Sequence, residues 1–192
     1  MRAFQVYALG SEKYADMYGT APAFESESLL AAHDQSFLTP ESSDLIHDAI
    51  AAGRLRAAVY TARPSLPPHD IPDTDGYSPE AEIAVGLTGL GDLPLIGFGH
   101  VSWLAAREGH HGDTFVKPSP VHALAAVGAA LSGRETDSLL AARELAVGGK
   151  MMSPLAEMAG EEIEVAVFED SVGGIEAVRG AAELLRSAGV KM

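Results

Sequence analysis

The sequence predicts an α/β fold in which helices cover a mostly parallel sheet. Short apolar segments at 56–62, 93–104 and 163–168 alternate with stretches of helical periodicity, a pattern typical of parallel strands joined by right-handed crossovers. In the last segment, four consecutive apolar residues from Val165 to Phe168 indicate a strand covered on both faces. Aromatic residues make up only 6% of the chain, and the frequent alanine and glycine residues allow helices to pack closely on a sheet.

Residues 1–36 are interpreted as an N-terminal segment that precedes a core at 37–192. Within this segment, residues 3–9 (AFQVYAL) predict a short strand, and residues 25–35 predict a weakly helical stretch. The segment is therefore expected to be either the first strand of the sheet or the remnant of a cap over the core.

A clearer helix is predicted between Thr39 and Gly53. Threonine is a favourable N-cap, the proline that follows it suits the first helical position, and glycine ends the helix. Apolar residues recur at helical spacing and predict a stripe that faces the core. These residues are Leu45, Ile46, Ala49 and Ile50.

A proline-rich loop is predicted at 63–79, because its five prolines exclude a central strand or a helix. Loops of this length are often functional lids or disordered links. The predicted strand at 56–62 comes directly before this loop and ends at Thr61. Further helices are predicted at 79–90, 120–131, 134–147 and 172–188, with a turn at 154–160.

Composition narrows the functional classes. A chain of 192 residues suits one domain. Its net charge of −14 argues against nonspecific nucleic-acid binding and against binding to an anionic membrane surface. The absence of cysteine excludes disulfides and thiolate metal sites. Apolar stretches fall far short of the roughly 20 residues of a membrane span, so the expectation is a soluble, cytoplasmic protein.

Two adjacent acids, Glu169 and Asp170, follow the predicted strand at 163–168. Ligands bind beyond the carboxyl ends of parallel strands, so these acids lie where a site is expected. A carboxylate there could bind Mg²⁺. The alternative is a helix cap, because acids before a helix are favoured by its dipole and its free N–H groups.

Two other polar residues occupy comparable positions. Thr61 ends the predicted strand at 56–62, and its hydroxyl could bind a phosphoryl oxygen. Lys117 lies in FVKPSP, between apolar residues and prolines, where it could neutralise phosphate charge or hold a carboxylate. The alternatives are an ordinary β-branched strand residue and a solvated surface lysine.

Three stretches in this order, VYTARP, FVKPSP and VFEDSVGGIEAV, resemble the second, third and fourth motifs of haloacid dehalogenase-like hydrolases. The resemblance covers roughly 37–192 and implies a Rossmann-like three-layer sandwich, here truncated at the sheet edges. It implies that Thr61 binds the phosphoryl group of a small phosphorylated molecule, that Lys117 balances its charge, and that Asp170 with Glu169 holds Mg²⁺.

The sequence departs from this family at its first motif. That motif is a strand ending in D-x-D, whose first aspartate is the nucleophile and whose second is the general acid and base. The acids before Thr61 follow no apolar strand and form no D-x-D; they are Asp16, Asp34, Asp44 and Asp48. We therefore expect a degenerate relative with a binding or regulatory role.

Two alternatives to a degenerate relative stay open. One is an active Mg²⁺-dependent phosphatase that takes its acid from the loop at 70–75, from another position such as Asp34, or from a partner subunit. Asp73 and Asp75 of the D-T-D-G stretch are the loop acids. The other is an unrelated α/β binding domain. The sequence indicates neither the substrate nor whether copies of the chain associate.

Overall fold

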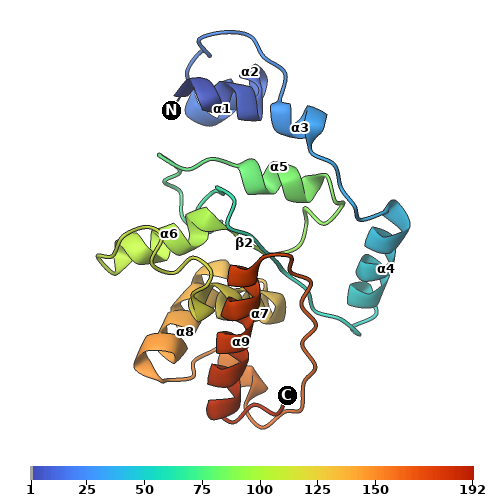
Figure 1. The fold of residues 1–192 in the computed structure, drawn as a ribbon, viewed down its shortest axis with the longest axis vertical. Helices are drawn as coiled ribbons and strands as arrows, with labels where there is room; N and C mark the ends of the chain where they lie inside the picture. Colours follow the sequence, from blue (N-terminus) through green and yellow to red (C-terminus); the bar gives the residue numbers. More distant parts are fainter. Residues whose placement is uncertain (1) are drawn as a thin grey trace.

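A computed structural model describes residues 2–192. Helices surround a single short sheet in this part of the chain (Figure 1). The helices are α1 (Arg2–Leu9), α2 (Ser11–Tyr18), α3 (Leu29–His33), α4 (Pro40–Ala51), α5 (Glu80–Gly86), α6 (Phe98–Arg107), α7 (Pro120–Ser132), α8 (Glu135–Gly148), the 3₁₀ helix η1 (Leu155–Met158) and α9 (Val172–Ser187). Among these residues, no helix is both long and apolar enough to cross a membrane.

The sheet consists of two parallel strands, β1 (Val59–Tyr60) and β2 (Leu95–Ile96). Val59 lies opposite Leu95 and packs with it against α5, whereas Tyr60 and Ile96 belong to the core around α7. This alternation follows from the two-residue period of a strand. The predicted α/β class is confirmed only in part: the described chain is mainly helical, with two parallel strands between the helices.

The main core is centred on α7, which packs against α8, α9 and β2. α7 is apolar on nearly all sides, as expected for a helix enclosed by its neighbours. Gly128 allows the close approach of α8, because a β-carbon there would lie 2.9 Å from Ser138 Cβ. The helices predicted at 120–131, 134–147 and 172–188 are confirmed as α7, α8 and α9.

The strand predicted at 3–9 is wrong, because this stretch forms α1. Val6 and Leu9, three residues apart, are buried on one side of the helix. The helix packs against α2 and α3, and α3 confirms part of the helical stretch predicted at 25–35. A helical contact face, rather than strand alternation, therefore explains the apolar residues of this stretch.

The strand predicted at 93–104 is confirmed only at Leu95–Ile96, and α6 begins at Phe98. Val101, Leu104 and Ala105 are buried at helical spacing. Gly99 lets the loop after β1 approach the start of this helix, since a β-carbon there would lie 2.2 Å from Ser65 O. Most of the apolar run is thus a buried helix.

The helix predicted after Thr39 is confirmed as α4, with the Thr39 hydroxyl accepting a hydrogen bond from Ser42 N–H. Its predicted core-facing stripe is confirmed only in part: Leu45 is 69% exposed, and the other three members of the stripe are half-buried. The fully buried residue of α4 is Ser43, whose hydroxyl donates to Gly89 O at 3.2 Å. A polar contact near its first turn therefore helps to dock α4.

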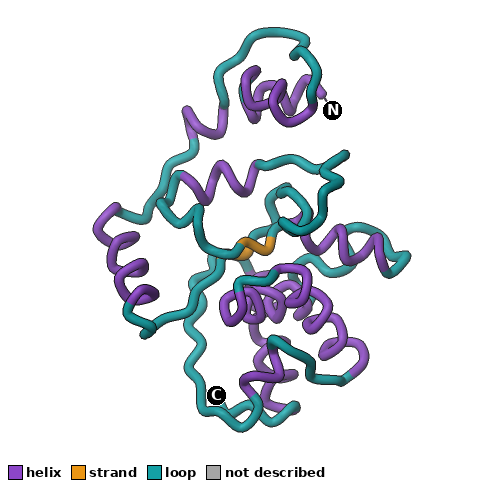
Figure 2. Tube along the Cα trace, turned by 180° about the vertical axis from the view of Figure 1, so that it is seen from behind, coloured by secondary structure: helices purple, strands orange, loops and turns teal. Residues whose placement is uncertain are grey.

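The strand predicted at 163–168 is also wrong. Residues 164–168, which we call the open segment, are extended but form no ladder with any described residue (Figure 2). Val165 and Val167 are 38% and 40% exposed, and Phe168 is 96% exposed. The chain pairs only before this segment, where Ile163 N–H donates to Lys191 O. Its apolar composition is not matched by a neighbouring strand in the described part of the chain.

Candidate functional site

Lys117 and Glu169, which the sequence places 52 residues apart, form an ion pair. Lys117 Nζ lies 3.1 Å from Glu169 Oε1 and 2.9 Å from Oε2. Their side chains are only 15% and 6% exposed, so the pair is not a solvated surface contact. We call Tyr60, Lys117, Glu169 and Ser171 the Lys117 cluster.

The start of α9 holds the Glu169 carboxylate. Ser171 donates to Glu169 Oε1 through its backbone N–H at 2.9 Å and its hydroxyl at 2.6 Å, and its oxygen accepts from Gly174 N–H as the N-cap. A β-carbon at Gly174 would lie 2.0 Å from Glu169 Cδ. The sequence EDSVGG therefore binds its own Glu169 carboxylate: Ser171 supplies the donors, and Gly174 leaves the space for the side chain.

Glu169 stays ionised and Tyr60 stays neutral at pH 7. Burial opposes the carboxylate charge, but the hydrogen bonds from Ser171 and Lys117 outweigh it and lower the pKa of Glu169 to about 2. Burial and the neighbouring Glu169 raise the pKa of Tyr60. The cluster thus carries one fixed carboxylate and one ammonium group.

Tyr60 and His122 position Lys117 from the sheet side. Lys117 Nζ lies 5.1 Å from the centre of the Tyr60 ring, and the Tyr60 hydroxyl donates to Gly174 O at 3.3 Å. His122 Nδ1 accepts from Lys117 N–H, which leaves Nε2–H to donate to Ile96 O. Burial lowers the pKa of His122 to about 4, so this imidazole is a neutral brace.

Thr61 follows β1 directly and lines an open cleft of about 410 Å³ together with Asp34 and Arg63. Its hydroxyl oxygen accepts from Arg63 N–H at 3.2 Å, and Arg63 Nη1 binds Asp34 Oδ2 at 2.5 Å. No hydrogen bond joins Thr61 to Lys117 or Glu169 among the residues described. The structure therefore brings the lysine and glutamate together, whereas Thr61 lines a separate cleft on the α5 side of β1.

Asp170 and Glu169 differ in their fitness to bind Mg²⁺. Both oxygens of Glu169 are taken by Lys117, and one also by Ser171. Asp170 is exposed, and its carboxylate makes no hydrogen bond or ion pair with the described residues. Over residues 2–192 there is no group of three or more metal-ligating acids and histidines. Asp170 thus fits a single carboxylate ligand, and Glu169 fits an anchor for Lys117.

The loop acids lie elsewhere. Asp73 Oδ1 accepts from Asp75 N–H at 3.1 Å in an exposed turn before α5. The nearby Tyr77 O accepts from the Tyr18 hydroxyl of α2. No hydrogen bond or ion pair in the described chain links either acid to the Lys117 cluster.

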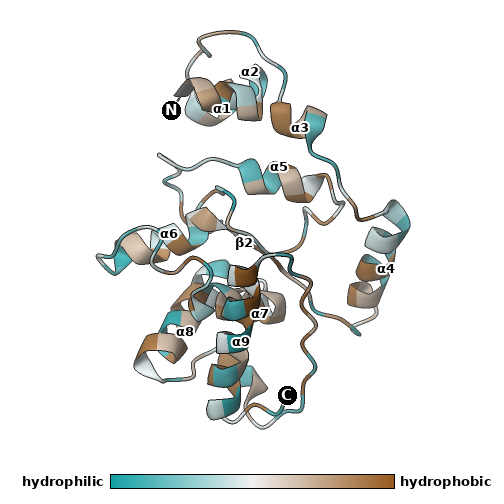
Figure 3. Cartoon of the chain, viewed as in Figure 1, coloured by the Kyte–Doolittle hydropathy of each residue, from teal (hydrophilic) through white to brown (hydrophobic). Residues whose placement is uncertain are grey.

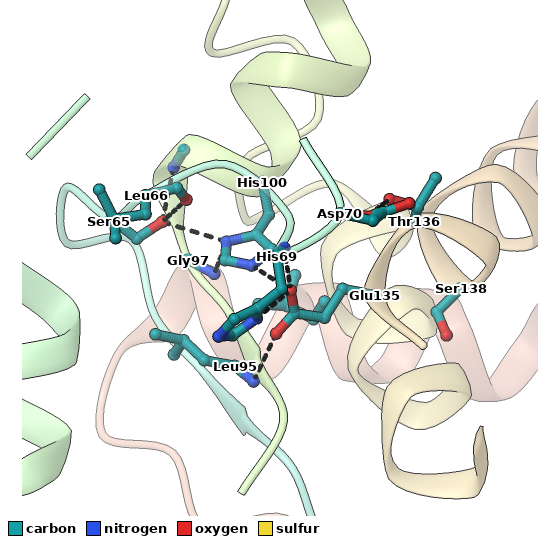
Figure 4. Close-up of polar contacts among 12 residues, drawn as sticks. Ser65, Leu66, His69, Asp70, Leu95, Gly97, His100, Glu135, Thr136 and Ser138 are labelled. Carbon is teal, nitrogen blue, oxygen red and sulfur yellow. Dashed lines mark hydrogen bonds and ion pairs between the residues drawn. The ribbon is translucent and has the colours of Figure 1, made fainter. Parts of the chain in front are cut away.

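A second polar cluster consists of Ser65, His69, His100 and Glu135, which we call the His100 cluster (Figure 4). His100 Nδ1 accepts from Gly97 N–H at 3.2 Å and lies 3.1 Å from Ser65 Oγ. This leaves Nε2–H to face Glu135 Oε2 at 3.1 Å, at an angle outside hydrogen-bond geometry, so that contact is electrostatic. The sequence indicates no partner for His100.

Glu135 ties the proline-rich loop to α8. Its Oε2 accepts from His69 N–H at 3.0 Å and lies 2.8 Å from His69 Nδ1. Burial opposes its charge, but contacts with His100 and His69 outweigh burial and lower the pKa of Glu135 to about 2. Hydrogen bonding to Glu135 in turn raises the pKa of His69.

The order serine, histidine, carboxylate is the arrangement used in nucleophilic hydrolysis. Here, however, Ser65 is 1% exposed and its oxygen accepts from Gly99 N–H at 2.9 Å. Its hydroxyl also lies 3.0 Å from Leu66 O. A substrate carbonyl cannot reach this oxygen, so the His100 cluster is a structural joint between the loop, α6 and α8.

Sequence reasoning missed several members of both clusters. Ser171 and Gly174 were visible in the EDSVGG stretch, where the cap pattern S-x-x-G follows the two acids. Tyr60 carried no signal, because an aromatic residue in a strand is ordinary. The His100 cluster joins residues that lie 35 and 66 positions apart, which no local pattern reveals.

Comparisons with protein-family models, with curated proteins and with solved structures find no match to this chain. The arrangement of the residues is therefore the basis of the functional proposal.

Proposed function

We propose that this protein is a haloacid dehalogenase-like domain that binds a small phosphorylated molecule at the Lys117 cluster and does not hydrolyse it. The finer fold that goes with this proposal is a Rossmann-like three-layer sandwich. The observation that carries the proposal is the ion pair of Lys117 with Glu169, seated on the Ser171–Gly174 turn. The two stretches that resemble the third and fourth family motifs, FVKPSP and VFEDSVGGIEAV, meet there although Lys117 and Glu169 are 52 residues apart.

Lys117 is suited to an anionic ligand. Its ammonium group has three donors, and the contacts to Glu169 hold it in one place without enclosing it, since the side chain is 15% exposed. The protein as a whole carries a net charge of −14, which repels anions at long range. A phosphate therefore needs a fixed local cation, and Lys117 supplies one.

Asp170 completes the proposed site as a ligand for Mg²⁺. Magnesium commonly keeps several waters and is bound by one or two carboxylates together with substrate phosphates. One exposed carboxylate, next in the chain to the Lys117 partner Glu169, fits that pattern, and the metal would offset the repulsion between Asp170 and the phosphate. Thr61, the phosphoryl ligand implied by the family resemblance, lies in the cleft with Asp34 and Arg63 and is not part of this proposed site.

Binding without hydrolysis is proposed because no described acid contacts Lys117 other than Glu169, and Glu169 is occupied by hydrogen bonds. Asp34 supports a second candidate function, an active phosphatase, because it lines the cleft that contains Thr61. Asp34 is bound to Arg63, which reduces its availability as a nucleophile.

The test is calorimetric titration of the protein with inorganic phosphate in the presence of MgCl₂. We expect binding in the wild type, a loss of at least about tenfold in affinity in Lys117→Met, and no change in Lys150→Met, an exposed lysine that serves as the matched control. Asp170→Asn should reduce the dependence on Mg²⁺. Circular dichroism confirms that each variant is folded.

Turnover of p-nitrophenyl phosphate separates the candidate functions. Turnover that is abolished by Asp34→Asn would establish the phosphatase and overturn the binding proposal. Equal affinity of Lys117→Met and the wild type, or no binding by the wild type, would favour an unrelated α/β binding domain.

A further inference from the structure

The open segment has the chemistry of a strand without a partner. Its backbone N–H and C=O groups at 164–168 form no hydrogen bond with any described residue. Three of its five residues are valine or phenylalanine, which favour strands. Figure 3 shows these hydrophobic residues on the extended stretch that leads into α9. Exposed strand edges of this kind are templates for pairing with another chain.

One face of the open segment borders an open cleft of about 310 Å³. Val165 and Val167 line it from the segment, and Val127 of α7 with Val178 and Leu185 of α9 line it from the helices. Three charged residues of α9 also line it: Arg179, Glu183 and Arg186. The segment is thus held near the helices without filling the space between them. Phe168, offset by one residue from Val167, is 96% exposed. Both faces of the segment retain apolar surface that a neighbouring strand could cover.

β1 offers a second strand edge. Val59 and Thr61 donate their N–H groups to β2, so those of Ala58 and Tyr60 point to the opposite side by strand alternation. These two residues make no further backbone hydrogen bond with the described chain. β1 and the open segment both lead into the Lys117 cluster, through Tyr60 and Glu169.

The charges around the open segment decide between two occupants. Glu161, Glu162 and Glu164 precede its apolar residues, and Glu169 and Asp170 follow them. A second copy paired antiparallel about Ala166, the centre of the open segment, would place Glu162 opposite Asp170, both exposed, and like charges directly opposite destabilise a pair. A strand with basic residues at its ends would instead be attracted by the exposed acids, Glu162 and Glu164 before the apolar residues and Asp170 after them.

We propose that the open segment is a docking site for an extended apolar peptide segment with basic flanking residues, which adds to the sheet as a strand. Main-chain hydrogen bonds supply affinity in this mode of recognition, and alternate side chains supply specificity. Here one set of side chains enters the cleft beneath Val165 and Val167, and the lysines or arginines at the ends meet the exposed acids.

The first test uses three synthetic peptides with blocked ends and the full protein. The probe is Lys-Lys-Val-Thr-Val-Ile-Val-Lys-Lys, and its matched controls carry glutamate in place of lysine or proline in place of the central valine. Fluorescence anisotropy should show the lysine-flanked peptide binding at least about tenfold more tightly than either control. Its affinity should fall as the salt concentration rises, because the end charges are exposed.

Hydrogen exchange locates the binding. The amides of 164–168 should exchange rapidly in the free protein, and alternate amides should become protected when the lysine-flanked peptide is added. Ala166→Pro and Val167→Pro remove N–H groups that point to opposite sides of the segment. One of these variants should lose binding and the other should retain it, and both should keep the wild-type urea midpoint because neither N–H is bonded in the free protein.

Three results would overturn the proposal. The amides of 164–168 could already be protected in the free protein, or the lysine-flanked and glutamate-flanked peptides could bind equally. Alternatively, light scattering could show dimers that Phe168→Asp dissociates, which would identify a second copy as the occupant. None of these readouts involves phosphate, so the docking site stands or falls independently of the proposed function.

Discussion

The Lys117 cluster and the His100 cluster both hold a nearly buried glutamate among polar donors, yet they differ in whether an accessible polar group remains for a ligand. In the His100 cluster, Ser65 is enclosed and already accepts a backbone hydrogen bond. In the Lys117 cluster, the anchored pair adjoins the exposed carboxylate of Asp170. The His100 cluster has the more familiar catalytic order, and the Lys117 cluster has the more usable groups.

The difference shows that order of residue types is weaker evidence for function than access and unused hydrogen-bonding capacity. A buried polar network whose members are occupied rigidifies a fold. A site needs at least one positioned group that still has a donor or acceptor facing a ligand. By this criterion the His100 cluster has a structural role, and the Lys117 cluster is the better candidate for a binding site.

The largest expected effect on stability is that of Glu135→Gln. The substitution places an amide among donors from His69, His100 and Leu95, so a buried contact is broken rather than replaced. We expect a loss of about 3 kcal/mol in the free energy of unfolding, measured by urea denaturation. Asp137→Asn, on the exposed side of the same helical turn, should change it by less than about 0.5 kcal/mol. Equal losses of stability in Glu135→Gln and Asp137→Asn would contradict a structural role of Glu135 in the His100 cluster.

Acid should remove this contribution. The pKa of Glu135 is lowered to about 2 in the folded protein, so its stabilisation is present above the unfolded value near 4.5 and is lost as the pH falls through 2. The difference in unfolding free energy between the wild type and Glu135→Gln should therefore grow as the pH falls from 7 through 6.5, because Glu135 raises the pKa of His69, and then shrink by about 3 kcal/mol towards pH 2. A difference that does not change with pH would mean that the charge of Glu135 is irrelevant.

The glycine pair of α9 offers a matched comparison at the Lys117 cluster. Gly174→Ala would place a β-carbon 2.0 Å from Glu169 Cδ, whereas at Gly173 the nearest atom is 3.8 Å away. We expect Gly174→Ala to lower the free energy of unfolding by about 2 kcal/mol through overpacking and to weaken phosphate binding. Gly173→Ala should be neutral or stabilising, because alanine favours the helix. The reverse ranking would mean that Glu169 is not seated on this turn.

Ser65→Ala should have the smallest of these effects and separates a structural serine from a nucleophile. The variant leaves Gly99 N–H without its acceptor, which costs about 1.5 kcal/mol of stability. Phosphate binding should be unchanged, as measured by the same calorimetric titration. Any esterase activity that disappears only in Ser65→Ala would show that the His100 cluster is accessible after all.

Capped helices could be predicted from the sequence, because their signals are local. Thr39 was a recognisable N-cap, and its hydroxyl accepts a backbone hydrogen bond at the start of α4. The short apolar runs were ambiguous, since a buried helix and a buried strand share the same composition. That ambiguity explains the errors at 3–9 and 93–104.

The candidate site could be predicted only in part. Lys117 and Glu169 were singled out by their positions in apolar or strand-ending contexts, and they do meet. The burial of the open segment could not be judged, because burial depends on neighbours that a strand pattern does not specify. Leu45 and Phe168 belong to predicted apolar elements, yet both are exposed in the structure.

The register of the short sheet links two layers of the molecule. Val59 and Leu95 serve the α5 side, while Tyr60 and Ile96 serve the α7 side. Slipping β1 by a single position would exchange these faces. Such a shift would turn the Tyr60 ring away from Lys117 and place the Val59 side chain there instead. An insertion of one residue between Gly53 and Ala58 that shifts β1 in this way would remove both the contact of Val59 with α5 and the contact of the Tyr60 ring with Lys117.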